Sequence, residues 1–346
     1  MIDVNRQYIE TAINELNDLI GTKYLKSEID ILDSLKKNNV KESIKKIAVE
    51  LTLPIDINLL YEGEISGNQY NAFVSNSLVN YDKYGCEGIY AQVHIPQDLP
   101  FYGSPQLNNF EIRVLANRKI LNHRDTFVMV VAHELSHILL ESLRFIKKNN
   151  EIYVDLVQIL LGFGDFYKRG RIIVESLSEN KYRKTTIGYL TDENVSFAYD
   201  YVEKINVKNN KLINEFNHKS TSLTKYKLNV EKKINYLEIY LDKLDSKKVI
   251  VKKEHIDSII KMHDLNFFVN LKTKNKNLSV QLDEIINNIS FLRLNSYGKI
   301  FLNEKFKTLD NLKKEYAILE NELSDNIQIL LRYLNFFTFI KYKLGN

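Results

Sequence analysis

Hydrophobic positions recur at helical spacing near the start of the chain and take on strand patterns further along. Residues 5–37 and 41–52 carry apolar side chains every three or four positions, which predicts amphipathic helices with a break near Gly21. Three later segments have the pattern of strands: 55–61, 88–95 and 110–116. We expect the last of these to be an edge strand, whose unpaired N–H and C=O groups could bind an extended peptide.

Beyond residue 206 the apolar residues follow alternating steps of three and four through polar surroundings. The seams run from Val230 to Leu244, from Leu278 to Leu292, and from Leu309 through Leu323 to Phe337. Short seams separated by polar turns predict an antiparallel helical bundle, and a dimerising coiled coil is the alternative. We therefore expect three parts: an N-terminal helical segment at 1–40, a mixed domain at 41–206 and a basic helical domain at 207–346.

The most informative segment is His133-Glu134-Leu135-Ser136-His137, which spells H-E-x-x-H. Histidines four apart project from one helical face about one turn apart, so both imidazoles can reach a single ion. Glu134 can then take a proton from water bound to that ion. The flanking residues 126–132 and 138–140 are nearly all apolar, so this helix is expected in the interior, where zinc would satisfy the three polar side chains. The alternative is a core helix whose histidines make ordinary hydrogen bonds.

A hydrolytic zinc site needs a third protein ligand and an open position for water. The extended motif with Gly and a third His is absent, because Leu140 and Leu143 stand at those positions. Glu141 shares the face of the two histidines, but it lies a further turn along the rigid helix and would overshoot the ion. A second helix is expected to begin at Glu151, which can bind the metal. Asp155, four residues on, can accept a hydrogen bond from a ligating imidazole.

The H-E-x-x-H segment followed by Glu151-x-x-x-Asp155 resembles the gluzincin pattern of thermolysin-like zinc metallopeptidases. Segments similar to 160–164 and 188–191 also occur in little-characterised bacterial zincin-like domains. The resemblance covers residues 40–206 and implies an α+β fold, a minimal zincin-like lobe whose small sheet packs on the active-site helix. The implied roles are one zinc ion per chain on His133, His137 and Glu151, with Glu134 as general base and Asp155 supporting a histidine ligand.

Tyr189 lies in the later Gly188-Tyr189-Leu190-Thr191 segment, just before a helix expected from Thr191 to about Ile205. Its hydroxyl could donate a hydrogen bond to the oxyanion of a tetrahedral intermediate. The chain has 21 tyrosines, so a packing role is the alternative. The remaining histidines lack the spacing of metal ligands: His94, His123, His218, His255 and His263.

Composition narrows the class of protein. Cys86 is the one cysteine, which excludes an intrachain disulfide framework and suits a reducing compartment. The first residues lack the basic-then-apolar pattern of a signal peptide, and no apolar run of membrane-spanning length occurs, so we expect a cytoplasmic protein. The net charge of +4 divides into +9 for 207–346 and −5 for the rest. Because the lysines of the basic part are scattered among acids, a solvated surface is favoured over nucleic-acid binding.

The sequence therefore predicts a zinc-dependent peptidase that cleaves an intracellular protein or peptide substrate with Glu134 as general base. Its C-terminal helices would recruit substrate, contact a protein partner or form a homodimer. The second hypothesis is a zincin-derived regulatory or binding module whose C-terminal helices contact a protein or nucleic-acid partner. The intact Glu134 argues against this second hypothesis, because a structural zinc site has no need of a base between its histidines.

Overall fold

The computed structural model describes residues 2, 4–61, 91–178, 181–246, 261–262, 264–289 and 294–343. The chain divides into two compact units, Met1–Lys208 with Arg293–Ser296 and Asn209–Leu292 with Tyr297–Asn346. Most described residues are helical and two small sheets accompany them, so the chain has the expected α+β composition in its general form. The N-terminal helical segment expected at 1–40 belongs to the first unit.

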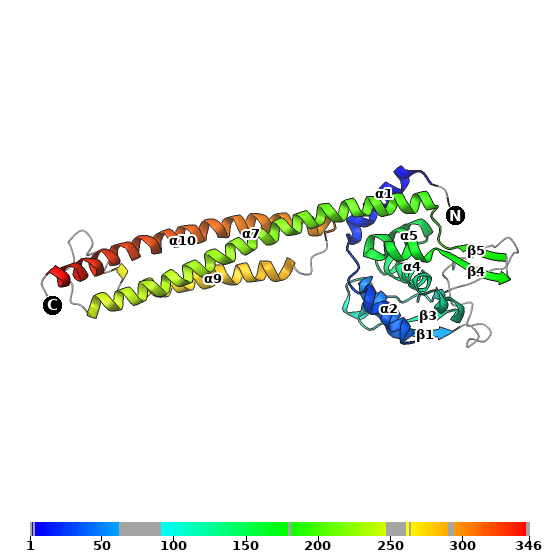
Figure 1. Cartoon of the computed structure of the whole chain (residues 1–346), viewed down its shortest axis with the longest axis horizontal. Helices are drawn as coiled ribbons and strands as arrows, with labels where there is room; N and C mark the ends of the chain where they lie inside the picture. The colour runs from blue at the N-terminus through cyan, green and yellow to red at the C-terminus, as the bar shows by residue number, and fades with distance from the viewer. Residues whose placement is uncertain are drawn as a thin grey trace. The chain divides into compact units, whose positions relative to one another are not determined.

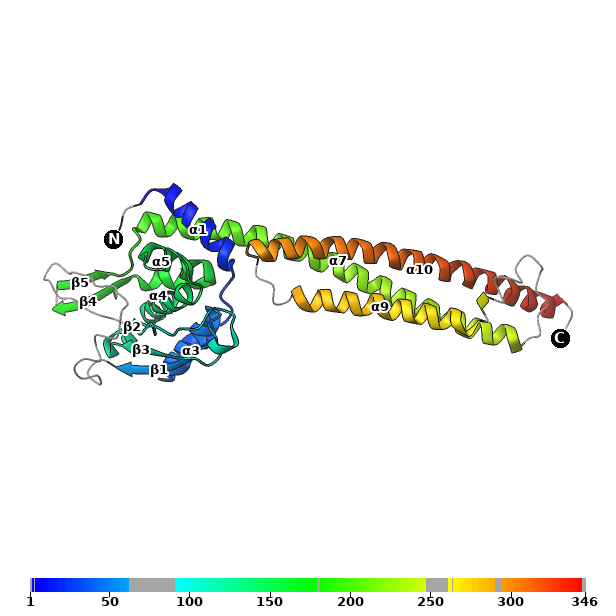
Figure 2. The same ribbon diagram turned by 180° about the vertical axis from the view of Figure 1, so that it is seen from behind.

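The first unit contains most of the shorter elements (Figures 1 and 2). Its α-helices are α1 (Arg6–Ile20), α2 (Glu28–Lys36), α3 (Val40–Glu50), α4 (Arg124–Ser142), α5 (Glu151–Gln158) and α6 (Gly164–Gly170). Short turns of other helix types are η2 (Pro105–Leu107), η3 (Arg118–Asn122) and η4 (Ile159–Phe163). The strands are β1 (Asp56–Tyr61), β2 (Ala91–Val93), β3 (Glu111–Ala116), β4 (Ile172–Ser178) and β5 (Lys181–Thr186). The long helix α7 (Asp192–Ser246) begins in this unit.

Asparagine side chains mark the first turns of three helices. Asn5, Asn39 and Asn150 each accept a hydrogen bond from a backbone N–H two or three residues further on. Such N-caps satisfy donors that have no partner inside the helix, and they fix where the helix begins. For α5 the cap at Asn150 makes Glu151 the first helical residue, as the sequence predicts.

The three-stranded sheet has the order β1-β3-β2, with β1 parallel and β2 antiparallel to β3. The predicted strands at 55–61 and 110–116 are confirmed as β1 and β3. Of 88–95, residues 88–90 lie outside the described residues and 91–93 form β2. The expectation that 110–116 is an edge strand is wrong, because β3 pairs on both sides. Alternation along a strand identifies its buried face, whereas its neighbours depend on contacts distant in sequence.

Helix α4 forms the centre of the first unit. It contacts α3, α5, α6 and strand β2, and its residues from Thr126 to Leu140 are all buried. The apolar residues around the H-E-x-x-H segment explain this position, because a helix that is hydrophobic on all sides is stable only when covered on all sides. Figures 1 and 2 show α4 between the strands and helix α5. The prediction of an interior helix is confirmed.

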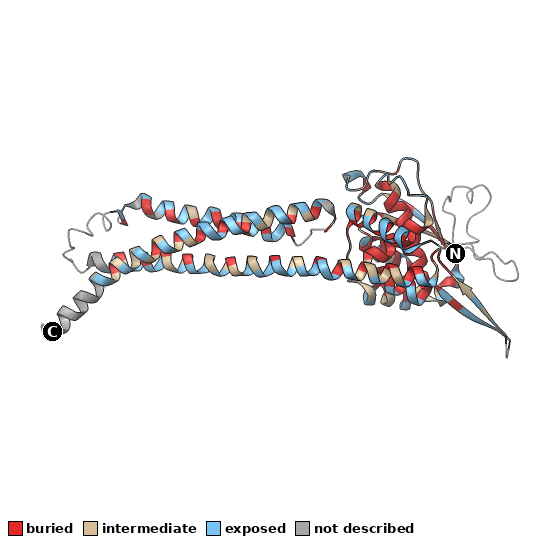
Figure 3. Ribbon diagram, turned by 90° about the horizontal axis from the view of Figure 1, so that it is seen from above, coloured by how far each residue is buried: buried red, intermediate tan, exposed pale blue. Residues whose placement is uncertain are grey.

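The second unit consists of the later part of α7 with α9 (Leu265–Ile289) and most of α10 (Ser296–Lys343). Figure 3 shows buried positions recurring along these three helices. Buried residues occupy the predicted seams: Val230, Ile234, Leu237, Leu241, Leu278, Leu282, Ile285, Ile289, Leu309, Leu312, Tyr316, Leu319 and Leu323. The side chains of Leu244, Leu292, Leu334 and Phe337 lie outside the described part. None of the described helices has the length and apolarity needed to cross a membrane.

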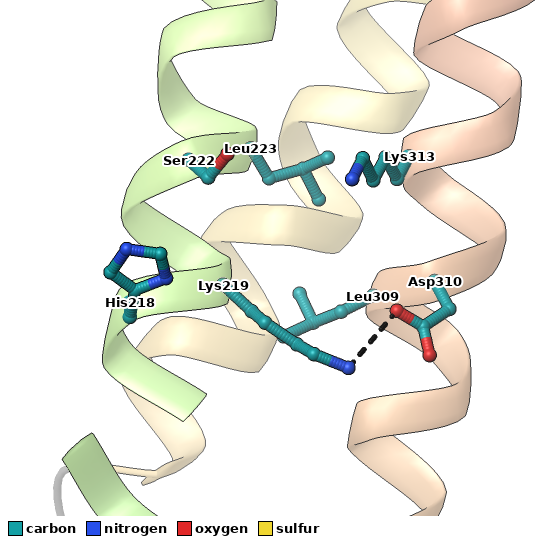
Figure 4. A pocket seen from close by; sticks show the side chains of 7 residues that line it. All are labelled: His218, Lys219, Ser222, Leu223, Leu309, Asp310 and Lys313. Atoms are coloured by element: carbon teal, nitrogen blue, oxygen red, sulfur yellow. Dashed lines mark hydrogen bonds and ion pairs between the residues drawn. The ribbon is translucent and has the colours of Figure 1, made fainter. Parts of the chain in front are cut away.

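A small cavity of about 140 Å³ lies between α7 and α10 in the second unit (Figure 4). Its walls are formed by His218, Lys219, Ser222, Leu223, Leu309, Asp310 and Lys313. The Lys219 Nζ atom lies 3.3 Å from Asp310 Oδ1. One cation of this cavity is therefore neutralised by a residue of the facing helix.

Candidate metal centre

The two histidines of the H-E-x-x-H segment lie side by side on helix α4. Their ring centroids are 5.1 Å apart, and the ring planes are nearly perpendicular, at 81°. His133 is completely buried and His137 is 6% exposed. The i, i+4 spacing and the uninterrupted helix account for this arrangement, because residues four apart project from one face.

Glu151 meets both histidines from the first turn of α5. Its Oε2 atom lies 3.2 Å from His133 Nε2 and 3.4 Å from His137 Nε2. One ligand atom from each residue lies within 4.8 Å of the other two, so this group could hold a metal ion. The structure therefore brings together the three residues that the sequence predicts as metal ligands.

The chemistry of these atoms fits a metal ion. His133 Nε2, His137 Nε2 and Glu151 Oε2 are buried, and none has a partner in hydrogen-bond geometry. The nitrogen and oxygen atoms lie close enough for electrostatic attraction, but their relative orientation does not meet the geometry of a hydrogen bond. Buried polar atoms in this state are costly, whereas two imidazole nitrogens and a carboxylate oxygen are a donor set that divalent zinc accepts.

Asp155 supports the His133 ring from the side opposite Glu151. Its Oδ1 lies 2.8 Å from His133 Nδ1, and both side chains are completely buried. A proton on Nδ1 leaves the lone pair of a neutral imidazole on Nε2, the atom that faces Glu151 and His137. Asp155 occupies the place that the sequence predicts for it.

The charges of the side chains in the centre complement one another. Burial by itself lowers the pKa of His133, but the neighbouring Asp155 and Glu151 carboxylates outweigh it and raise this pKa to about 10. Burial raises the pKa of Glu151, and the two histidines reverse the effect and lower it to about 2. The centre thus stabilises positive charge between carboxylates, as a cation site requires.

Glu134 and Tyr189 complete the surroundings of the centre. Glu134 is completely buried on α4, next to His133. The Tyr189 ring stacks on the His133 ring, with centroids 5.7 Å apart and an interplanar angle of 20°. Burial and the charges of Glu151, Asp155 and Glu134 raise the pKa of the Tyr189 hydroxyl well above its ordinary value. The hydroxyl therefore keeps its proton at neutral pH and can act as a donor.

Two of the three candidate ligands keep some exposed surface. The His133 side chain is 0% exposed, whereas the side chains of His137 and Glu151 are 7% and 15% exposed. The exposed surface of the ligand group therefore belongs to His137 and Glu151. The complete burial of His133 follows from its place against Asp155 and the Tyr189 ring.

The other acid considered from sequence points elsewhere. Glu141 pairs with Lys148 at 2.7 Å and with Arg144 at 3.5 Å, and it is outside the ligand group. Its position agrees with the expectation that it overshoots the ion. Cys86, His255 and His263 lie outside the described residues, and the described histidines His94, His123 and His218 are not in the ligand group.

Sequence reasoning missed the residues behind Asp155. The carboxylate also accepts hydrogen bonds from the Tyr167 hydroxyl at 2.6 Å, the Tyr189 backbone N–H at 2.8 Å and Gln158 Nε2 at 3.3 Å. Gln158 is three residues from Asp155 on the same helix, so helical spacing alone could have suggested it. Tyr167 had no comparable signal, because its contact depends on how α6 packs.

Comparisons with known proteins give no match: no protein-family model fits the chain, and searches of curated proteins and of solved structures find no significant similarity.

Proposed function

We propose that the chain is a zinc-dependent peptidase of the gluzincin type, with a zincin-like lobe in its first unit. The observation that carries the proposal is the convergence of His133 Nε2, His137 Nε2 and Glu151 Oε2 within 4.8 Å, beside a buried glutamate on the same helix. A site built only to bind metal for stability needs the three ligands and a fourth, but it does not need Glu134. A hydrolytic site needs the three metal ligands and also a base such as Glu134.

Zinc suits this donor set better than calcium or magnesium, which prefer oxygen ligands. When bound, it would supply an acidified water molecule and polarise a carbonyl group. His133, His137 and Glu151 would hold it, and Asp155 would keep His133 in the tautomer that presents Nε2.

The protein's own groups would move the proton. Glu134 would accept a proton from the attacking water and later deliver it to the leaving amine. Its place next to the ligand His133 on α4 supports this role. Tyr189 would donate a hydrogen bond to the oxygen on which negative charge develops, since its hydroxyl stays protonated at neutral pH.

A second candidate function is a regulatory or binding module that keeps a metal for structure. The observation in its favour is the enclosure of the centre: two of the four polar side chains, His133 and Glu134, have no exposed surface. In that case the basic C-terminal helices would contact a protein or nucleic-acid partner, and the binding of nucleic acid would depend strongly on salt.

Metal analysis combined with a cleavage assay tests the proposal. Zinc is quantified in the purified full-length chain and in His133→Ala, and both are incubated with an unbiased peptide library. We expect about one zinc per chain and cleavage for the natural sequence, and neither for His133→Ala. Stoichiometric zinc without cleavage at any pH, including after addition of cell extract, would instead support the module. Absence of zinc from a folded chain would contradict both the peptidase and the metal-holding module.

A further inference from the structure

Tyr167 lies on α6 and is completely buried, although tyrosine usually keeps its hydroxyl in contact with water. Its hydroxyl oxygen is 2.6 Å from Asp155 Oδ2. The other carboxylate oxygen, Oδ1, is the one that faces His133 Nδ1 at 2.8 Å. Asp155 therefore lies between a phenol and an imidazole, and one of its oxygens faces each.

The partners around this carboxylate fix the direction of every hydrogen bond. The Tyr189 backbone N–H and Gln158 Nε2 can only donate, so Asp155 accepts from both. A carboxylate can only accept, so the Tyr167 hydroxyl donates its proton to Asp155 Oδ2. The hydroxyl proton of Tyr167 is therefore directed to Asp155.

We infer that Tyr167 is a positioning residue for the metal centre, which fixes the Asp155 carboxylate and through it the tautomer and orientation of His133. The inference rests on the proposed metal site. Donors on both carboxylate oxygens prevent Asp155 from rotating about its terminal torsion, which is otherwise broad. A fixed Asp155 keeps the proton of His133 on Nδ1 and directs its Nε2 lone pair toward His137 and Glu151.

Among the side chains that donate to Asp155 from outside the centre, Tyr167 is better suited to this task than Gln158. A hydroxyl–carboxylate bond of 2.6 Å is short and charge-assisted, whereas the Gln158 bond is 3.3 Å. Gln158 also moves with Asp155, since both are on α5. Tyr167 belongs to α6, which packs against α4. It therefore holds Asp155 from an element that also contacts the helix carrying His133.

The test measures zinc affinity of the full chain by competition with a chromophoric chelator, so its readout does not depend on peptidase activity. Tyr167→Phe removes one hydroxyl and keeps the buried ring. We expect its zinc dissociation constant to rise about tenfold, at the low end of what partners behind metal ligands contribute. Asp155→Asn should raise it at least as much.

Tyr153→Phe is the matched control. Tyr153 is also buried, on α5, and its hydroxyl donates to a carboxylate at 2.7 Å, but that carboxylate belongs to Glu15 and not to the centre. Both substitutions lose a tyrosine–carboxylate bond, so both should lower the melting temperature. Only Tyr167→Phe should change zinc affinity.

A double-mutant cycle isolates the path through Asp155. In the Asp155→Asn background, Tyr167→Phe should change the zinc dissociation constant less than about twofold. Equal zinc affinity for Tyr167→Phe and Tyr153→Phe would overturn the inference, as would full additivity in the cycle. If Tyr167→Phe does not fold, Gln158→Met removes another donor from the same carboxylate, and additivity of its effect with Asp155→Asn would equally refute positioning through Asp155.

The outcomes separate the inference from the proposed function. Zinc binding without peptide cleavage would refute the peptidase and leave the inference standing if the cycle is non-additive. Zinc binding with an additive cycle would refute the inference alone. A natural chain that binds no zinc would refute both.

Discussion

The hydroxyl of Tyr167 occupies the space that a side chain at Gly188 would need. A Cβ atom placed on Gly188 would lie 2.2 Å from the Tyr167 hydroxyl oxygen, well inside any van der Waals contact. Gly188 also has φ of +102°, a backbone conformation that other residues rarely adopt. The glycine thus allows the turn before Tyr189 to pass close to the hydroxyl that holds Asp155.

Gly188→Ala should therefore destabilise the protein and weaken zinc binding. We expect a loss of about 2–4 kcal/mol in the free energy of unfolding, from backbone strain together with steric crowding. Gly103→Ala is the control, because Gly103 has φ of +79° with no atom within 4 Å of an added Cβ. Gly103→Ala should lower the free energy of unfolding through backbone strain alone and leave zinc affinity unchanged. Equal effects of the two substitutions in urea unfolding and chelator competition would contradict the steric account.

Glu134→Gln should separate metal binding from hydrolysis. The amide is nearly the same size as the carboxylate but cannot accept the proton, so peptide cleavage should fall by about 10²–10⁴-fold, the usual contribution of a general base. Zinc content should stay at the natural level, because Glu134 is outside the ligand group. Cleavage rates on a peptide library and zinc quantification on the same preparation check this. Retained turnover in the zinc-loaded variant would remove Glu134 from the role of base.

Substitution of two glutamates tests which of them is the third metal ligand. Glu151→Ala removes the oxygen that lies 3.2 and 3.4 Å from the two histidines, so zinc affinity should fall more than about 100-fold. Glu141→Ala breaks only ion pairs with Lys148 and Arg144 and should change zinc affinity less than about twofold. Chelator competition measures both. The reverse order would assign the third ligand to Glu141.

Glu50 should make the stability of the first unit depend on acid pH. This buried carboxylate, at the end of α3, pairs with Lys23 and accepts a hydrogen bond from Ser27. Burial raises its pKa, but these partners outweigh burial and lower it below the ordinary value of 4.5. Because the folded pKa lies below the unfolded one, the contribution to stability is complete above about pH 4.5 and is lost as pH falls through the folded pKa.

Glu50→Gln should accordingly lower the free energy of unfolding by about 2 kcal/mol at pH 7, with a smaller difference in acid. Urea unfolding followed by circular dichroism at pH 7 and near pH 3 checks the sign. Asp33→Asn, which removes an exposed pair with Lys36, is the control and should have a much smaller effect. A Glu50→Gln penalty that grows toward acid pH would show that the linkage has the opposite sign.

The sequence alone determined the parts of the centre that depend on local geometry. His133 and His137 share a face because they are four residues apart on one helix, and the apolar run around them requires that helix to be buried. Asn150 caps α5, so the helix begins at Glu151 and places Asp155 one turn further along. The helical seams of the second unit likewise follow from the spacing of apolar residues along each helix.

Tertiary structure alone decided which distant residues meet. The packing of α6 and of the turn at Gly188 brings Tyr167 and the Tyr189 backbone to Asp155, and no spacing in the sequence encodes those contacts. Strand β3 is central for the same reason: its alternating pattern specifies one buried face, while its two neighbours come from segments far away in the chain. Periodicity reports the environment of each residue within its own element. The partners across elements are set by the packing of the whole core.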